Sequence, residues 1–228
     1  MPEISLREYE IEIDQLIEEA RYLEALAHLR HIVSQYPRYL EAYYLMGKML
    51  LEADQPNLAV DMFRRALNAD PEHLKSRIGL GLAHEQRDDL NAAIWNLERA
   101  FELAPANADI AEELRRIYGR RDGKEPAHIP ISRAGLARLY MRGNLSNRAV
   151  VEFRHLLESE PNRPDLLGAL AEAYWRDGQI VQASETCQEI LDDMPYHWKA
   201  NLLLGTLWLN SGQEEGQTYL NRSQEVDI

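Results

Sequence analysis

A few side chains in this 228-residue sequence are of types that perform chemistry, and their spacing decides whether they can act together. His28 and His31 are three residues apart, which places both on one face of a helix. The sequence shows no third metal ligand near them, so we expect two exposed surface histidines. His84 and Glu85 are adjacent and therefore point in different directions on a helix. We predict no metal site from these residues.

Cys187 is the single cysteine of the chain. One cysteine excludes an internal disulfide and a zinc site made of thiolates. Cys187 stands at a helix position that is usually occupied by an apolar core residue. We therefore expect a small buried side chain and no nucleophile. Asp192 and Asp193 are interpreted as surface charge at the end of a helix. Since no phosphate loop, nucleophile elbow or zinc-protease helix occurs either, we predict no catalytic residue and no cofactor.

The charge balance excludes other classes of protein. Acidic residues number 38 and basic residues 25, for a net charge of -13. This balance argues against nucleic-acid binding, which needs clustered Lys and Arg. No run approaches the roughly 18 uncharged apolar residues of a membrane helix, and the acidic start MPEISLREYEIEID lacks the features of a signal peptide. We therefore expect no membrane contact and a reducing, cytoplasmic setting, and the 45% hydrophobic content suffices for a folded core.

The sequence repeats with a period of 34 residues. Two independent markers share this period and one phase. A closing proline recurs at Pro37, Pro71, Pro105, Pro161 and Pro195, and an alanine recurs at Ala25, Ala59, Ala93, Ala149 and Ala183. Within each unit the small and apolar residues follow steps of three and four, which predicts two antiparallel helices, A and B. The proline cannot continue helix B, so it marks where that helix ends.

This pattern resembles the tetratricopeptide repeat family, whose units are 34-residue helix-turn-helix motifs. The resemblance extends from about Leu6 to the C-terminus and is clearest at Tyr43, Met46, Gly47, Leu50, Ala59, Phe63, Ala66 and Pro71. It implies an all-α, right-handed superhelical solenoid of antiparallel helix pairs, with about six repeats, one of them incomplete. It also implies a non-catalytic scaffold or adaptor that binds a protein or peptide segment.

The phase of the repeat breaks in the middle of the chain. Pro105 and Pro161 are 56 residues apart, about one helix short of two repeats. We therefore expect an N-terminal array over 6–121 that ends in a lone helix A, an irregular connector over 122–131, and a C-terminal array over 132–228. Two interpretations of the connector are open: a flexible linker, or an ordered strap that packs Ile129 and Ile131 in place of helix B. The last unit is weak because Gly216 stands where alanine is expected, and the missing cap suggests a longer protein or a covering partner.

Positions 2, 5, 9 and 12 of each helix A form what we call the second stripe, about 130° around the helix from the stripe that packs on helix B. The resemblance implies that the second stripe lines a concave groove for a partner. Its large apolar residues suit a segment with apolar anchors, unless neighbouring repeats cover them. A Lys/Asn clamp for a C-terminal carboxylate, known in the family, is not expected, because Glu10 and Asp14 would repel that group. We predict partner contacts at Tyr44, Lys48, Ile78, Leu82, Arg116, Arg138, Met141 and Trp175.

The charges are distributed unevenly along the chain. Residues 1–73 and 164–228 carry net charges of -7 and -8, whereas residues 122–163 carry +2. This arginine-rich middle is interpreted either as ordinary solvated surface or as a site for an acidic partner segment or another copy. Two alternatives to a groove-binding scaffold therefore stay open: a self-assembling structural module, and the targeting arm of a larger enzyme.

Overall fold

The computed structural model describes residues 5–227, which form thirteen α-helices and no strand. Residues 1–4 and Ile228 lie outside the described residues. The sequence MPEISLREYEIEID, from which we expect no signal peptide, begins in this part. Consecutive helices pack as antiparallel pairs, which confirms the predicted all-α solenoid. The first stack consists of α1 (Leu6–Glu18), α2 (Tyr22–Gln35), α3 (Leu40–Glu52), α4 (Pro56–Ala69), α5 (Leu74–Gln86), α6 (Leu90–Leu103) and the lone α7 (Ala108–Asp122).

The second stack contains three further pairs. Its last pair is complete, because the weak segment after Gly216 still forms a helix against α12. The helices are α8 (Arg133–Arg142), α9 (Ser146–Ser159), α10 (Pro164–Arg176), α11 (Ile180–Asp193), α12 (Trp198–Asn210) and α13 (Gly216–Gln224).

The turn from helix A to helix B has the same backbone conformation in every complete pair. One residue of each turn has a positive φ, and within each stack these residues lie 34 positions apart: Ala20 (57°), Asp54 (55°) and Asp88 (58°) in the first, and Asn144 (56°), Gly178 (78°) and Gly212 (81°) in the second. Gly, Asn and Asp tolerate this left-handed conformation best. The repeated turn therefore keeps successive pairs in register.

Close packing of the helices depends on small residues that face large ones. The ring of Phe63 is buried between Gly47 of α3 and Gly79 of α5. A Cβ atom on either glycine would lie 2.6 Å or 2.4 Å from that ring, which is closer than van der Waals contact allows. The two glycines thus let two neighbouring A helices approach the same helix B.

The connector after α7 carries the chain from the first stack to the second without a helix B. Arg115 Nε donates a hydrogen bond to the carbonyl oxygen of Pro126 at 2.9 Å. Ile129 packs partly buried against the core of α6 and α7, whereas Ile131 is exposed. Helix α8 packs directly against α6, so the second stack starts beside the first.

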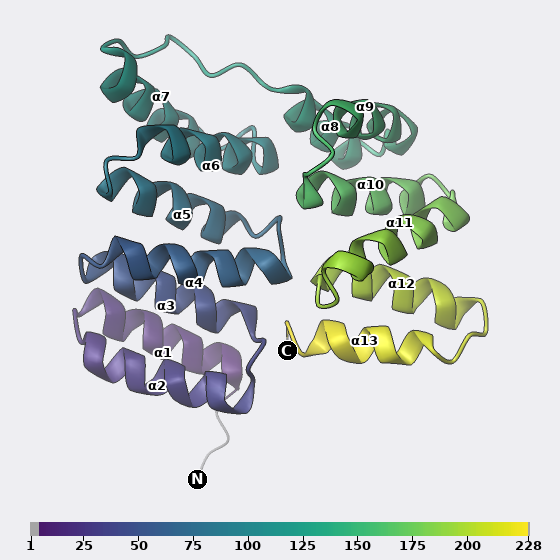
Figure 1. The fold of residues 1–228 in the computed structure, drawn as a ribbon, viewed down its shortest axis with the longest axis horizontal. Helices are drawn as coiled ribbons and strands as arrows, with labels where there is room; N and C mark the ends of the chain where they lie inside the picture. The colour runs from purple at the N-terminus through teal and green to yellow at the C-terminus, as the bar shows by residue number, and fades with distance from the viewer. Residues whose placement is uncertain (1–4, 228) are drawn as a thin grey trace.

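The two stacks lie side by side, and the C-terminal end of the chain returns to the first stack (Figure 1). The backbone N–H of Leu40, at the start of α3, donates to the carbonyl oxygen of Val226 at 3.0 Å. The Val226 side chain is fully buried with Leu40 and Ala66. Arg38 and Glu225 form an ion pair at 2.8 Å beside this contact. The solenoid is therefore closed on itself, which the repeat pattern did not predict.

Candidate functional site

On the first stack, the charged residues of the second stripe pair with one another between neighbouring A helices. These contacts link α1 to α3, α3 to α5 and α5 to α7: Asp14–Lys48 at 2.6 Å, Glu41–Lys75 at 2.8 Å and Glu85–Arg116 at 2.5 Å. Two of the predicted partner contacts, Lys48 and Arg116, thus already have carboxylate partners within the chain. Such partly exposed pairs contribute little stability, so a partner could displace them at small cost.

The apolar residues predicted on the same stack are partly buried. Tyr44 lies against the rings of Phe63 and His73, with centroid distances of 6.2 Å and 5.6 Å. Burial raises the pKa of Tyr44 to about 12. Ile78 packs against the core of α6 and α7, and Leu82 is half-buried. These side chains mainly hold repeats together and offer only part of their surface.

Two predicted partner contacts are not at the surface at all. Arg138 is 8% exposed and forms ion pairs with Glu72 of the first stack and with Asp165 of α10, the latter at 3.4 Å. Met141 is also 8% exposed, within the core of the second stack. Neither residue is available to a partner in this closed arrangement, because the second stack packs on itself and against the first.

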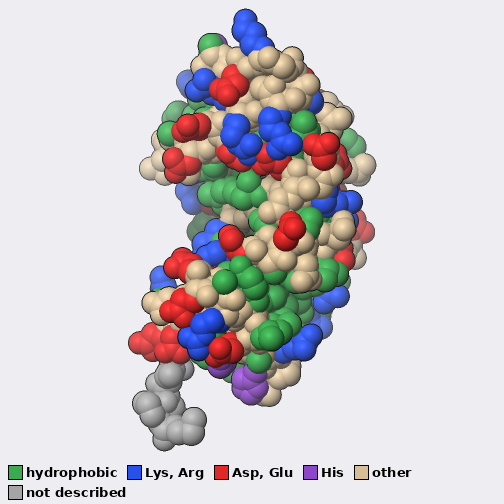
Figure 2. Space-filling model, turned by 90° about the vertical axis from the view of Figure 1, so that its left-hand side faces the viewer, with side chains coloured by type: hydrophobic (Ala, Val, Ile, Leu, Met, Phe, Trp, Pro, Cys, Tyr) green, Lys and Arg blue, Asp and Glu red, His purple; other side chains and the backbone are tan. Residues whose placement is uncertain are grey.

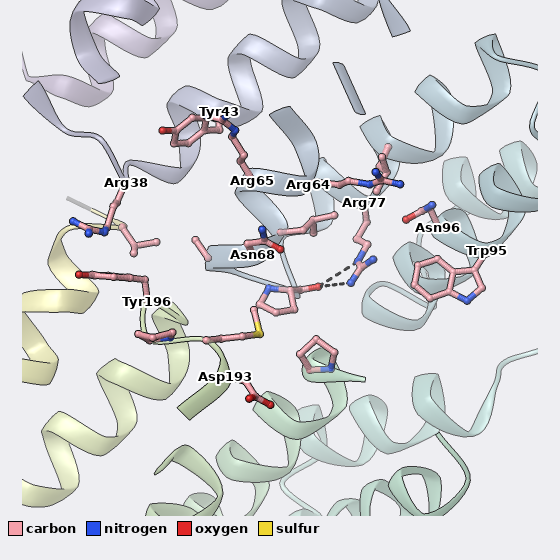
Figure 3. Close-up of a pocket in the computed structure, with 18 of the residues that line it drawn as sticks. Arg38, Tyr43, Arg64, Arg65, Asn68, Arg77, Trp95, Asn96, Asp193 and Tyr196 are labelled. Atoms are coloured by element: carbon pink, nitrogen blue, oxygen red, sulfur yellow. Dashed lines mark hydrogen bonds between the residues drawn. The ribbon is translucent and has the colours of Figure 1, made fainter. Parts of the chain in front are cut away.

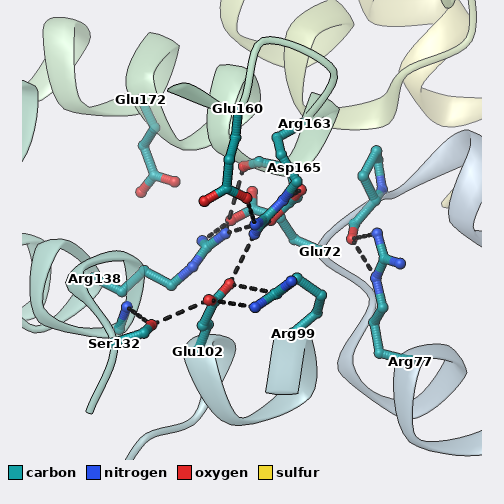
Figure 4. Close-up of polar contacts among 12 residues, drawn as sticks. Glu72, Arg77, Arg99, Glu102, Ser132, Arg138, Glu160, Arg163, Asp165 and Glu172 are labelled. Atoms are coloured by element: carbon teal, nitrogen blue, oxygen red, sulfur yellow. Dashed lines mark hydrogen bonds and ion pairs between the residues drawn. The ribbon is translucent and has the colours of Figure 1, made fainter. Parts of the chain in front are cut away.

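Arg138 belongs to a buried ionic network that joins the two stacks (Figure 4). Glu72, in the turn between α4 and α5, pairs with both Arg138 and Lys199, and Lys199 also pairs with Glu172 at 2.7 Å. Burial alone would raise the pKa of Glu72, but the positive charges of Lys199 and Arg138 outweigh burial and hold that pKa below its ordinary value. Glu72 is therefore ionised and neutralises two cations of the opposite stack.

A second part of the network centres on Arg163, which precedes α10. Its guanidinium binds both carboxylate oxygens of Asp165, at 2.8 Å and 2.7 Å, and reaches Glu102 of the first stack at 2.7 Å. Glu102 also accepts from Arg99 at 2.9 Å and from Ser132 at 3.1 Å. This network could not be predicted from the sequence, since the residues that link the stacks, such as Glu102 and Arg163, are 61 positions apart and follow no period.

The second stripe of the second stack is more open. Trp175, Leu202 and Leu209, from α10 and α12, are 41%, 37% and 37% exposed. Met141, Trp175 and Leu209 occupy equivalent positions 34 residues apart, and only Met141 is covered. A hollow of about 680 Å³ lies beside Trp175 and is also lined by Asn144, Ser146 and Arg176. We call Trp175, Leu202 and Leu209 the apolar row.

A larger cleft lies between the two stacks (Figure 3). Its volume is about 1080 Å³, and its walls come from α3–α6, the turn between α11 and α12, and Val226. The polar and aromatic residues that line it are Arg38, Tyr43, Arg64, Arg65, Asn68, Arg77, His84, Asp89, Trp95, Asn96, Asp193 and Tyr196. A smaller cavity of about 740 Å³ lies beside the connector, where a helix B is missing.

Of the residues first considered for chemistry, His84 and Asp193 line the larger cleft, whereas Cys187, His28 and His31 do not. Cys187 is fully buried, as predicted, and burial raises the pKa of its thiol to about 12. His28 is half-buried and hydrogen-bonded to Tyr9, contrary to the expected exposure, while His31 is exposed. Within residues 5–227 no three His, Cys, Asp or Glu side chains are grouped to hold a metal ion. No helix of this described part is long and apolar enough to cross a membrane.

The charges on the outer side of the first stack are mixed. Figure 2 shows acidic and basic side chains interspersed there with hydrophobic patches. Several arginines in and just before the arginine-rich middle are already paired in the chain: Arg116 with Glu85 and Glu113, Arg120 with Glu85, and Arg133 with Glu152. The arginine-rich middle is therefore partly neutralised by intramolecular ion pairs.

The fold is that of a helical-repeat protein built from tandem pairs of antiparallel helices. A family model of the tetratricopeptide repeat matches residues 16–78. Residues 16–78 therefore carry tetratricopeptide repeats, and similar helix pairs continue through both stacks.

Comparisons with individual proteins show similarity to parts of longer chains. Superkiller protein 3 of Schizosaccharomyces pombe is 26% identical over 200 residues, which cover 77% of this chain and 14% of that protein. Protein O-mannosyl-transferase TMTC3 of Homo sapiens is 24% identical over 212 residues, covering 86% of this chain and 23% of that protein. Among solved structures, the TPR2AB domain of yeast Sti1 in its pHSP90 complex has a TM-score of 0.46 and 16% identity, covering 94% of this chain and 87% of that one. This chain thus spans less than a quarter of the two curated relatives.

Proposed function

We propose that this chain is a non-catalytic scaffold that holds a segment of a partner protein on the second stripe of its A helices. One observation carries the proposal: the apolar row presents three large side chains from neighbouring helices to solvent. Contiguous exposed apolar side chains with a polar surround are typical of interaction sites. The hydrophobic effect would drive their burial under a partner segment.

Trp175 is the expected anchor of this surface. Tryptophan is enriched among the residues that dominate binding energy, because it buries a large area at low entropic cost. The hollow beside Trp175 gives a partner side chain a place to insert. The ion pair between Arg176 and Glu172 at 2.6 Å supplies a polar edge next to it.

The first stack is proposed to contribute more weakly. Tyr44, Ile78 and Leu82 offer partial apolar surface, and Lys48 and Arg116 could exchange their present carboxylate partners for those of a ligand. Arg138 and Met141 are not part of the proposed surface, because both are buried.

Self-assembly is a second candidate, since the apolar row could equally seat another copy of the chain. The charge-driven form of this idea is weakened because several arginines of the arginine-rich middle already pair within the chain. Light scattering over a range of salt concentrations separates the candidates: an oligomer seated on the apolar row persists as salt rises, a charge-driven oligomer dissociates, and a scaffold for other proteins alone stays monomeric. A role as the targeting arm of a larger protein is compatible with either, as the chain matches only parts of longer relatives.

The proposal is tested with a phage-displayed peptide library selected on the wild-type protein. Enriched peptides are then measured by fluorescence anisotropy on Trp175→Ala/Leu209→Ala and on a matched control, Val151→Ala/Val181→Ala. The control residues are exposed apolar side chains on B helices, 65% and 66% accessible. We expect affinity to fall at least about tenfold in the first variant, as for a lost aromatic anchor, and to stay unchanged in the control. Equal loss in both variants, or no enriched peptide, would contradict the proposal.

A further inference from the structure

The cleft between the two stacks exists only because the solenoid is closed. Helices α4 and α6 form one wall, and the turn between α11 and α12 forms part of the other. This surface lies away from the apolar row: none of that row lines the cleft. The cleft therefore calls for an account separate from the proposed scaffold surface.

The arginines of the cleft are held by aromatic rings. Three of the four lie over rings that also line the cleft: Arg38 over Tyr196 at 3.7 Å, Arg65 over Tyr43 at 5.7 Å and Arg77 over Trp95 at 5.5 Å from the ring centroids. A guanidinium over a ring gains cation–π energy, while its N–H groups remain able to donate in its own plane. The rings thus position donors that are not consumed by the stacking.

Most of these cations have no acid partner. Within residues 5–227, Arg64, Arg65 and Arg77 make no ion pair, in a chain whose net charge is -13. Arg77 donates only to the carbonyl oxygen of Pro71, at 3.2 Å and 3.3 Å. Among the described residues, Arg38 is the one arginine of the cleft lining with an acid partner, Glu225. This concentration of unneutralised positive charge makes the cleft complementary to an anionic ligand.

The acids in the lining do not neutralise these arginines. Asp89 accepts from the N–H of Ala92 at 3.1 Å as the N-cap of α6, and its other oxygen lies 3.5 Å from His84 Nδ1. Asp193 is exposed at the end of α11. Neither carboxylate is within ion-pair distance of an arginine of the described chain.

A second observation points to a peptide. Asn96 is 3% exposed and lines the cleft, where Figure 3 shows its amide facing Arg77. Its Nδ2 donates to the carbonyl oxygen of Ala92 at 2.8 Å, but its Oδ1 accepts no hydrogen bond from the described residues. A buried acceptor without a donor is costly, and a ligand N–H would satisfy it. A polypeptide offers such N–H groups beside its carboxylates, whereas an inorganic anion such as sulfate or phosphate has no N–H group.

We propose that the cleft binds an acidic segment of a partner protein, with carboxylates at Arg64, Arg65 and Arg77 and a backbone N–H at Asn96. Charge-assisted hydrogen bonds between guanidinium and carboxylate groups would supply most of the binding. The aromatic rings would cover the segment's apolar atoms. The site does not depend on the apolar row and would act as a second contact of the same scaffold.

The probe is a fluorescein-labelled peptide of alternating glutamate and glycine, with the glutamine counterpart as ligand control. Anisotropy is measured on the full chain at low and at high salt. We expect binding of the glutamate peptide that weakens with salt and that falls about tenfold or more in Arg64→Glu/Arg65→Glu. The matched control is Arg148→Glu/Arg154→Glu, because both arginines are exposed on α9, lie outside the cleft and impose the same charge change.

The other outcomes are equally informative. Equal binding of the two peptides, equal loss in both charge variants, or complete displacement by inorganic phosphate would overturn the proposal. A single-stranded oligonucleotide that binds more tightly than the glutamate peptide, and loses this binding in Arg64→Glu/Arg65→Glu, would overturn the proposal and indicate a nucleic-acid ligand. Trp175→Ala/Leu209→Ala should leave binding of the glutamate peptide unchanged, so failure of the scaffold proposal and failure of this one are distinguishable. Circular dichroism confirms that each variant is folded.

Discussion

Removing the charge of Glu72 should weaken the association of the two stacks more than any change at an exposed ion pair. Glu72→Gln keeps the size of the side chain but leaves Arg138 and Lys199 without their shared carboxylate. The three side chains are largely buried, so water cannot replace the lost charge. The two cations would then repel each other across the junction.

The expected cost follows from what each cation retains. Breaking a buried pair by removing one partner typically costs about 3–5 kcal/mol. Arg138 keeps Asp165 at 3.4 Å and Lys199 keeps Glu172 at 2.7 Å, which softens the loss. We therefore expect the lower end, a loss of about 3 kcal/mol of unfolding free energy. For an m-value of about 2–3 kcal/mol/M, this lowers the urea midpoint by about 1–1.5 M.

The assay is urea denaturation followed by circular dichroism, with small-angle X-ray scattering in the absence of urea to detect opening. The control is Glu113→Gln, which neutralises a partly exposed partner of Arg116 and should cost less than about 1 kcal/mol. Because the folded-state pKa of Glu72 is lowered, its contribution is present above its unfolded pKa and is lost as pH falls through the folded value. Equal stability of the two variants at neutral pH, with unchanged scattering, would refute the role given to the network.

Three further changes test other parts of the structure. Burial lowers the pKa of His197 to about 4, so the unfolding free energy should fall by about 3 kcal/mol as the pH drops from about 6.5 to 4. In urea titrations at several pH values, His197→Asn should reduce this dependence on pH, and the same dependence in both proteins would contradict the prediction. Gly79→Ala puts a Cβ 2.4 Å from the Phe63 ring and should cost about 1–3 kcal/mol in urea unfolding, with partial rescue by Phe63→Leu; additive losses would contradict the contact. Val226→Ala should cost about 2 kcal/mol and speed hydrogen exchange at the Leu40 amide, whereas unchanged exchange would mean that the end of the chain does not dock there.

The repeat itself could be predicted from the sequence because each unit carries its own local signals. Prolines that end helices, small residues that allow close packing and the helical spacing of apolar residues act within one unit or between neighbours. The missing helix B after α7 was also visible, as a shortfall between Pro105 and Pro161.

The closure of the solenoid could not be predicted from the same signals. Glu72 is 66 residues from Arg138 and 127 from Lys199, and these pairs follow no period. The path of the connector decides which surfaces meet, and its residues carry no helical pattern. Arg138 belongs to the second stripe, as do exposed residues such as Trp175, so only the tertiary structure shows that Arg138 is buried.

Photocrosslinking tests the central claim, that the apolar row holds a partner segment, most directly. A benzoylphenylalanine is placed at Trp175 or at the exposed control position Val181, and each protein is irradiated with a library-selected peptide. We predict that benzoylphenylalanine at position 175 crosslinks to the peptide, that excess unlabelled peptide abolishes this crosslink, and that position 181 gives none. Crosslinking at 181 alone, or equally at both positions, would contradict the claim.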